Sequence, residues 1–258
     1  MKLQLSTWPD VENYLKNSQG IVIPMGSTEQ HGPSGLIGTD AIASETIAWA
    51  MAEHVNILIA PTLNLGPASF NLEFPGTICL RPSTWINLVV DFVDSLAHQG
   101  FRFFYFLNGH GGNMAPTQSA LQEVQRSRST AGHRGAPLQF RVKNWWDFPE
   151  VNILRKNWYG DGEGMHATPS EISITQYTHP SECPPDHLPP AKPLTLDFLK
   201  AHAGDQHGDS ISHKLNFPDG RVGSNSALAN SEHGQILIDV AAQAATNDYL
   251  SMLKESDA

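Results

Sequence analysis

The chain has 258 residues, of which 40% are hydrophobic and 16% are charged, and its formal net charge is -10. This length suffices for one large domain with a substantial core, and the negative charge without a Lys/Arg cluster argues against a nucleic-acid partner. No apolar run reaches the roughly 18 residues of a membrane span, the N-terminus lacks a secretory pattern, and there are only two cysteines. We therefore expect a cytoplasmic protein without a membrane partner.

Short apolar runs alternate along the chain with segments of helical periodicity. The predicted strands are 20–24, 57–61, 101–109 and 138–146, and the predicted helices are 39–54, 83–100, about 115–127 and about 234–254. Thr39 or Asp40 is expected to cap the first of these helices, and Ser83 the second. Because each strand is almost uniformly apolar, the pattern is typical of a parallel sheet covered by helices on both faces.

This architecture places ligands beyond the C-terminal ends of the strands. Polar, glycine-rich stretches follow the predicted strands at 25–40, 64–77 and 108–114. Residues 180–230 are rich in Pro, His, Asp and Gly, and we expect them to form a long loop-rich excursion from a single α/β domain.

The stretch GSTEQHGPSGLIGTD (26–40) gathers two acids and an imidazole after the first predicted strand. Glu29 and His31 are two residues apart, so on an extended segment both side chains point the same way. Asp40 follows a loop that can fold back, and its carboxylate could bind one ion or bridge two. The three side chains are therefore candidates for a common cation site.

Two later motifs bring further candidate ligands. NGHGGN (108–113) presents His110 between glycines at a strand end, and GDGEGMHATPSEIS (160–173) places His166 and Glu171 five residues apart. Imidazoles and carboxylates that arrive from separate strand ends form a mixed nitrogen and oxygen set, which suits Zn²⁺, Mn²⁺ or Fe²⁺.

Each motif also has a simpler interpretation. Asp40 alone could cap a helix, and NGHGGN alone could form a turn or an anion-binding nest. The alternative to a metal enzyme is thus a non-catalytic, anion- or nucleotide-binding α/β module, although no Walker motif or GxGxxG follows a strand. A serine hydrolase is disfavoured because no G-x-S-x-G motif is present. The joint placement of the motifs at strand ends favours the metal site.

The motifs PMGSTEQHGPSGLIGTDAIASE, FPGT (74–77), NGHGGN and HATPSEIS occur in an order that resembles the creatininase family. This family includes creatinine amidohydrolase and metal-dependent formamide hydrolases. The resemblance runs from about residue 5 to the C-terminal helix and includes GRVGSNSALANSEHG (220–234). It implies one three-layer α/β/α domain with a mainly parallel sheet, in a homo-oligomer that is commonly a hexamer. It also implies hydrolysis of a non-peptide C–N bond in a small cyclic amide or formamide.

The resemblance implies roles for individual residues. The expected ligands of one or two Zn or Mn ions, with Fe as a further candidate, are Glu29, His31, Asp40 and His110, and Asp40 would bridge two ions. Glu171 would be a further ligand or an acid beside the metal, and His166 would carry protons.

The remaining expectations concern the small-molecule substrate. The metal and the backbone N–H groups of Gly111 and Gly112 would stabilise the oxyanion that forms when activated water attacks. Trp145, Trp146 and Trp158 are expected to wall a pocket for a flat substrate, or else to be ordinary core aromatics.

Three features depart from the family pattern. In the creatinine-hydrolysing members, a Glu two residues after the NGH histidine binds the second metal. This chain has Gly112 there, as the deformylase-like members do. The segment before FPGT reads SFNLE instead of containing a Glu–His pair, and GSN (223–225) replaces a common GD. We therefore expect this chain to share the family's metal chemistry more closely than its specificity for creatinine.

Overall fold

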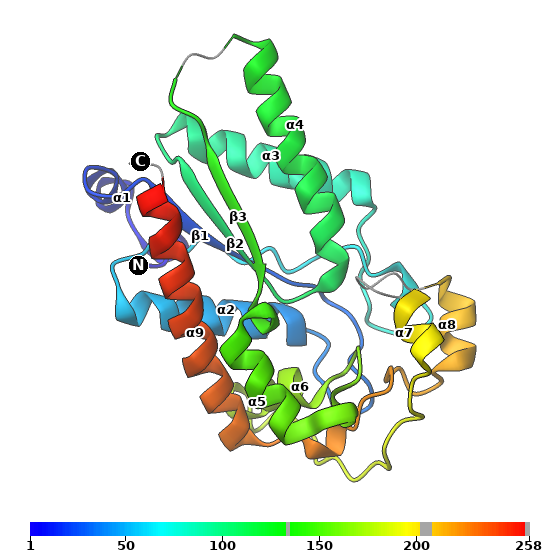
Figure 1. Cartoon of the computed structure of the whole chain (residues 1–258). Helices are drawn as coiled ribbons and strands as arrows, with labels where there is room; N and C mark the ends of the chain where they lie inside the picture. Colours follow the sequence, from blue (N-terminus) through cyan, green and yellow to red (C-terminus); the bar gives the residue numbers. More distant parts are fainter. Residues whose placement is uncertain (133–134, 202–207, 256–258) are drawn as a thin grey trace.

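Three parallel strands form the centre of the structure, in the order β1 (Gly20–Met25), β2 (Phe103–Asn108) and β3 (Gln139–Asn144). The structure is a computed structural model and describes residues 1–132, 135–201 and 208–255. Helices cover both faces of the sheet (Figure 1). The expected three-layer α/β/α arrangement is therefore confirmed.

The segment 57–63 extends the sheet beyond β1. The predicted strand at 57–61 forms only isolated parallel bridges, from Ile59 to Val22 and to Lys2, and Leu63 just beyond it bridges to Met25. Backbone hydrogen bonds still join the two segments, since the N–H of Val22 donates to the Leu58 carbonyl at 3.0 Å and that of Ala60 to the Val22 carbonyl at 2.8 Å. β1 therefore has a neighbour on each side, and all six of its residues are buried.

The strand residues alternate between two hydrophobic clusters. Ile21, Ile23 and Phe104 belong to one cluster, whereas Val22 and Tyr105 belong to the other. This alternation is the two-residue period of a strand buried on both faces. The first cluster is covered by α1 (Trp8–Leu15), α3 (Pro82–His98) and α4 (Met114–Thr130), and the second by α2 (Thr39–His54), α5 (Pro149–Tyr159), α6 (Pro169–Thr178) and α9 (Ser231–Lys254).

The excursion after α6 contains only short helices among its described residues: α7 (Leu196–Ala201), α8 (Ser210–Asn216) and a 3-10 turn, Ser226–Leu228. Figure 1 shows α7 and α8 at the edge of the molecule, away from the sheet. The α8 helix packs on the 3-10 turn Ser69–Asn71, where the His213 and Phe70 rings lie 4.9 Å apart. No helix in the described part of the chain is long and apolar enough to cross a membrane.

The expected helix caps are wrong. Helix α3 begins at Pro82 after Arg81, so Ser83 lies inside its first turn; proline suits a first helical position because that N–H needs no helical partner. Helix α2 follows Gly38 without a side-chain cap. The Asp40 carboxylate instead accepts a hydrogen bond from the Ser27 hydroxyl at 2.7 Å, so its side chain is turned toward the loop after β1.

Two glycines let the first turn of α2 lie against the strand ends. A Cβ on Gly26 would come within 2.4 Å of the Ala41 nitrogen, and one on Gly109 within 2.1 Å of the Asp40 carbonyl oxygen. Real side chains essentially never approach so closely, so neither position accepts even alanine without a backbone shift. This packing fixes Asp40 over the ends of β1 and β2.

We expect Gly109→Ala to lower the free energy of unfolding by about 1–3 kcal/mol, because the new methyl group overlaps backbone that cannot rotate away. Urea denaturation monitored by circular dichroism measures the change. Gly208→Ala is the control, since a Cβ there meets nothing within 4 Å. Equal stability of the two variants would contradict this account of the packing.

Candidate functional site

The sheet register brings the motif-bearing loops to one edge. Met25 pairs with Asn108, which in turn pairs with Asn144, so the three strands end level with one another. The loops that follow carry Glu29 and His110 to this edge. The expectation that the polar stretches gather at the C-terminal strand ends is therefore confirmed.

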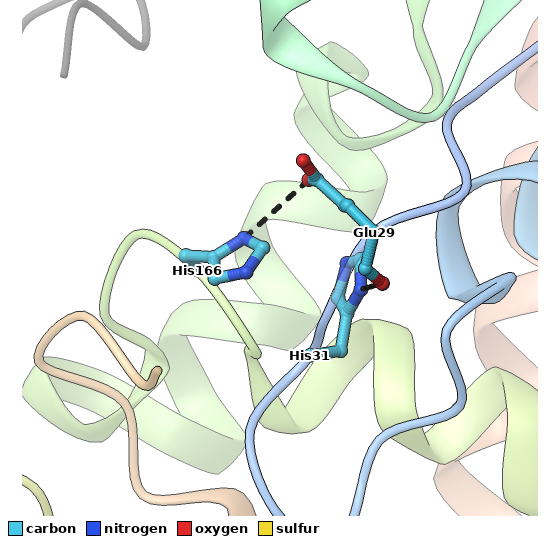
Figure 2. A group of neighbouring side chains, drawn as sticks. All are labelled: Glu29, His31 and His166. Carbon is cyan, nitrogen blue, oxygen red and sulfur yellow. Dashed lines mark hydrogen bonds and ion pairs between the residues drawn. The ribbon is translucent and has the colours of Figure 1, made fainter. Parts of the chain in front are cut away.

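Six of the residues singled out in the sequence lie together in the interior at this edge. None exposes more than 8% of its surface: Glu29, His31, Asp40, His110, His166 and Glu171. They form three overlapping trios whose potential ligand atoms lie within 4.8 Å of one another: Glu29–Asp40–His110, His31–Asp40–Glu171 and Glu29–His31–His166. Figure 2 shows the third trio, with the Glu29 carboxylate turned toward the His166 ring.

Asp40 lies at the centre of the cluster and uses its two oxygens in different directions. Its Oδ1 lies 2.9 Å from His31 Nε2, and its Oδ2 lies 3.0 Å from His110 Nδ1. Glu29 Oε1 is 3.1 Å from the same His110 nitrogen, and Glu171 Oε1 is 3.9 Å from His31 Nε2. The first two trios therefore share one carboxylate between them.

Each of the three imidazoles has one ring nitrogen beside a backbone carbonyl. His31 Nδ1 lies 3.1 Å from the Glu29 carbonyl, His110 Nε2 lies 2.8 Å from the Pro67 carbonyl, and His166 Nε2 lies 2.7 Å from the Gln30 carbonyl. A carbonyl can only accept, so these nitrogens carry the hydrogen. In each neutral ring the other nitrogen then has the lone pair, and that nitrogen faces the carboxylates. Metal-binding histidines are oriented in this way in known sites.

The loop before α6 sets the direction of two further groups. Ala167, between His166 and the N-cap Thr168, has a φ of 54°, a conformation that is uncommon for a residue with a side chain. Thr168 and Glu171 form a capping box, in which the Thr168 N–H donates to Glu171 Oε1 at 2.6 Å. The cap therefore holds the Glu171 carboxylate at the start of the helix, where it faces His31.

The side chains of the NGHGGN motif hold His110 in place. Asn108 Oδ1 accepts the His110 backbone N–H at 3.1 Å and the Asn113 amide at 3.1 Å, and Asn113 also donates to the Gly26 carbonyl. A Cβ on Gly112 would lie 2.5 Å from the Pro67 carbonyl oxygen and 2.6 Å from His110 Nε2. Glycine at 112 therefore leaves room for the hydrogen bond that orients His110.

The acids of the cluster depend on positive charge among them. Burial raises the pKa of Glu171 to about 7 and raises that of Glu29, because neither carboxylate is well solvated. Burial also opposes protonation of His31, but the Asp40 and Glu171 carboxylates outweigh it and raise the His31 pKa to about 10. The pKa of His110 lies well above its usual value for the same reason, through Glu29 and Asp40.

These donors fit a divalent cation. The three carboxylates are buried side by side, and protonated imidazoles are one source of the positive charge that they need. A divalent cation is the other source, because binding of a metal releases those protons and leaves the facing nitrogens free to coordinate it. Zn²⁺ and Mn²⁺ accept such mixed imidazole and carboxylate sets.

A cavity of about 530 Å³ opens beside the cluster. Its walls contain five of the six clustered residues (His31 is the exception), together with Gly111, Trp145, Trp146 and Arg155. Two expected substrate-contacting residues are absent from this lining. Gly112 faces Pro67 instead, and Trp158 stacks on His233 with ring centroids 4.0 Å apart. Of the two alternatives for these indoles, packing among other aromatic rings holds for Trp158, whereas Trp145 and Trp146 line the cavity.

The sequence analysis missed several residues that support the cluster. The Asn71 amide donates to Glu29 Oε2 at 3.1 Å and lies 3.3 Å from His166 Nε2. Asn71 could have been found from its position in SFNLE, because that stretch departs from the family pattern next to FPGT. Ser27, which donates to Asp40, lies inside the 26–40 stretch but was not singled out there, and Arg155, which lines the cavity, lies in no motif.

Comparison with known protein families and sequences gives a consistent result. The family model described as creatininase, creatinine amidohydrolase, matches residues 4–248. Creatinine amidohydrolase of Pseudomonas putida is 23% identical over 247 residues, which cover 92% of this chain and 91% of that protein. A mycofactocin precursor peptide peptidase of Mycobacterium tuberculosis is 35% identical over 125 residues, covering 45% of this chain and 49% of that protein. The match therefore spans about half the length of this second relative.

Solved structures share the fold. A creatininase variant complexed with creatine has a TM-score of 0.81 at 22% identity, with 96% of each chain covered. A manganese form of creatininase has a TM-score of 0.79 at 22% identity, again over 96% of each chain. A zinc–zinc form gives the same three values.

We expect Gly112→Ala to weaken metal binding by about 10–100-fold, because the methyl group would displace the carbonyl that orients His110. Chelator competition with zinc measures the affinity, and circular dichroism checks that the variant is folded. Gly208→Ala again serves as the control. Unchanged zinc affinity in a folded Gly112→Ala protein would contradict the role given to this hydrogen bond.

Proposed function

We propose that this chain, which belongs to the creatininase family, is a metal-dependent amidohydrolase acting on a non-peptide C–N bond of a small cyclic amide or formamide. The observation that carries the proposal is the orientation of the three imidazoles. In each ring, one N–H donates to a backbone carbonyl, and the other nitrogen is turned toward buried carboxylates. His31 and His110 can release the protons that these nitrogens carry beside the acids, and the nitrogens are then available as ligands next to carboxylates that can bind the same cation.

The proposed ligands form two sets that share Asp40. Glu29, Asp40 and His110 would hold one ion, and His31, Asp40 and Glu171 a second. Zinc and manganese are the metals of the solved creatininases with this fold. Glu171 would take the place left by Gly112, because the capping box holds its carboxylate toward His31. When bound, the metal lowers the pKa of a water molecule toward ~7 and polarises the substrate carbonyl.

His166 is the proposed proton carrier. Its Nδ1 is 3.8 Å from Glu29 Oε1, and the residue lines the cavity. With Nε2 held by the Gln30 carbonyl, Nδ1 would accept a proton from the attacking water and deliver it to the leaving nitrogen. The Gly111 backbone lies at the same wall and would donate to the developing oxyanion.

The second candidate substrate is an N-formyl aminopyrimidine. Gly112 favours it, because the creatinine-hydrolysing members carry a Glu at this position and the deformylase-like members do not. The indoles of Trp145 and Trp146 line the cavity and would pack on a flat ring of either substrate class. A peptide amide belongs in the same substrate panel, since the mycofactocin precursor peptide peptidases match part of the chain.

We expect the purified protein to lose hydrolysis of its preferred substrate when it is stripped with a chelator, and to regain it with Zn²⁺ or Mn²⁺. The panel consists of creatinine, cyclic ureides, N-formyl aminopyrimidines and a peptide amide. Elemental analysis before and after stripping gives the ions per chain. Tightly bound metal together with chelator-sensitive activity would exclude a merely anion-binding module.

Glu29→Gln keeps the size of the side chain and removes its charge, so it should reduce metal affinity and activity by at least about 100-fold. The exposed Glu53→Gln is the matched control and should behave as the wild type. Activity that survives chelation in the wild type, or metal content unaffected by Glu29→Gln, would contradict the proposal.

His166→Gln should lower kcat by about 10²–10⁴-fold while metal content stays at the wild-type level. Glutamine preserves a donor near the Gln30 carbonyl but has no nitrogen at the position of Nδ1. Steady-state kinetics and elemental analysis separate the two effects, with the exposed His54→Gln as control. Loss of metal together with activity would instead identify His166 as a ligand.

A further inference from the structure

Arg155 on α5 lies in the wall of the cavity that contains the proposed metal ligands. Its side chain is 17% exposed, so most of its surface is removed from water. The other formally charged side chains in the lining are carboxylates: Glu29, Asp40, Asp147 and Glu171. Among the described residues that line the cavity, Arg155 is therefore the only lysine or arginine.

Neighbouring groups hold the guanidinium by two of its three nitrogens. Nε donates to Glu163 Oε1 at 2.8 Å, and Nη1 donates to Asn152 Oδ1 at 3.0 Å and to the Trp146 carbonyl at 3.4 Å. Nη2 has no hydrogen-bond partner among the described residues. A guanidinium fixed at two nitrogens loses little further freedom when the third binds an acceptor, so its remaining N–H groups are preorganised donors.

A chain of hydrogen bonds links this arginine to the proposed metal centre. Glu163 Oε1 also accepts the Ser170 hydroxyl, whose oxygen lies 3.1 Å from Thr168 Oγ1. Thr168 in turn donates its backbone N–H to Glu171. A continuous chain of hydrogen bonds therefore relates the position of the guanidinium to the ligand cluster.

Aromatic rings line the same cavity. The Arg155 guanidinium carbon lies 5.9 Å from the centroid of the Trp145 ring, and the Trp146 ring meets Trp145 edge to face at 5.8 Å. The cavity thus presents an acid-rich cluster suited to a metal, apolar indole surface and a cationic donor. A flat molecule with a polar group at each end matches this distribution of chemistry.

We propose that Arg155 binds a carboxylate of the substrate through Nη2, and that the preferred substrates are therefore amides bearing an acid group remote from the scissile C–N bond. This inference rests on the proposed function, because it takes the clustered ligands as the reacting end of the cavity. Glu163 and Asn152 aim the guanidinium and leave Nη2 available. A charge-assisted hydrogen bond of this kind discriminates an acid from its neutral amide.

Binding of dicarboxylates tests the inference without requiring turnover. The probes are succinate, glutarate and terephthalate, each compared with its own monoamide, on the zinc-loaded protein by isothermal titration calorimetry. Both members of a pair offer one carboxylate to the metal, and only the diacid offers a second one to Arg155. We expect at least one diacid to bind about tenfold or more tightly than its monoamide.

Variants separate recognition from a structural role. Arg155→Gln should abolish the preference for the diacid and leave binding of the monoamide close to that of the wild type, whereas Arg155→Lys should retain part of the preference. Arg126→Gln, at a well-exposed position of α4, is the matched control. A merely structural arginine would change the affinities of diacid and monoamide equally.

The inference is overturned if no pair shows a preference in the wild type, or if the preference persists in Arg155→Gln. Failure of the proposed function has a different signature, since the protein would then bind no zinc at the start of the titration. Zinc content is therefore measured on every sample before the probes are added.

Discussion

The structure depends on one electrostatic constraint, the burial of Glu29, Asp40 and Glu171 beside one another. Carboxylates removed from water are costly unless positive charge or hydrogen bonds compensate them. Within the protein the compensation comes from His31 and His110, whose pKa values are raised by these acids, and from single donors such as Ser27 and Asn71. This arrangement suits exchange of protons for a divalent cation, since the same nitrogens that carry protons next to the acids can serve as ligands.

The backbone meets this constraint through a few local features. Carbonyl groups of Glu29, Gln30 and Pro67 fix the hydrogen on each imidazole, so the side chains need no second layer of acids to orient them. Glycine at 112 makes room for one of these contacts, and the positive φ of Ala167 turns the chain between His166 and the cap of α6. The unusual backbone conformation and the small residue thus occur next to the side chains whose orientation they set, His166 and His110.

In the proposed ligand sets, the absence of a Glu at position 112 does not leave the second set short of an acid. Glu171, on α6, supplies that acid: its carboxylate lies 3.9 Å from His31 Nε2 and is held by a capping box at the start of its helix. The excursion after α6 also contacts the surroundings of the cluster, because α8 packs on the turn that carries Asn71 and Asn71 donates to Glu29. Residues outside the Glu-x-His and NGHGGN motifs therefore also hold the clustered side chains in place.

Local sequence determined the elements and the ligand candidates. Apolar runs and helical periodicity predicted β1, α2, β2, α4, β3 and α9 to within a few residues, and the placement of polar motifs after strands predicted the edge at which they meet.

Tertiary structure decided what local pattern could not. Asp40 is turned into the site instead of capping α2, Trp158 packs on His233 outside the cavity, and Gly112 faces Pro67. Asn71 joins Glu29 across 42 positions, and Arg155 enters the cavity wall from α5 without any motif. The physical reason is that a motif fixes which groups are available, whereas the packing of distant segments fixes which atoms those groups face.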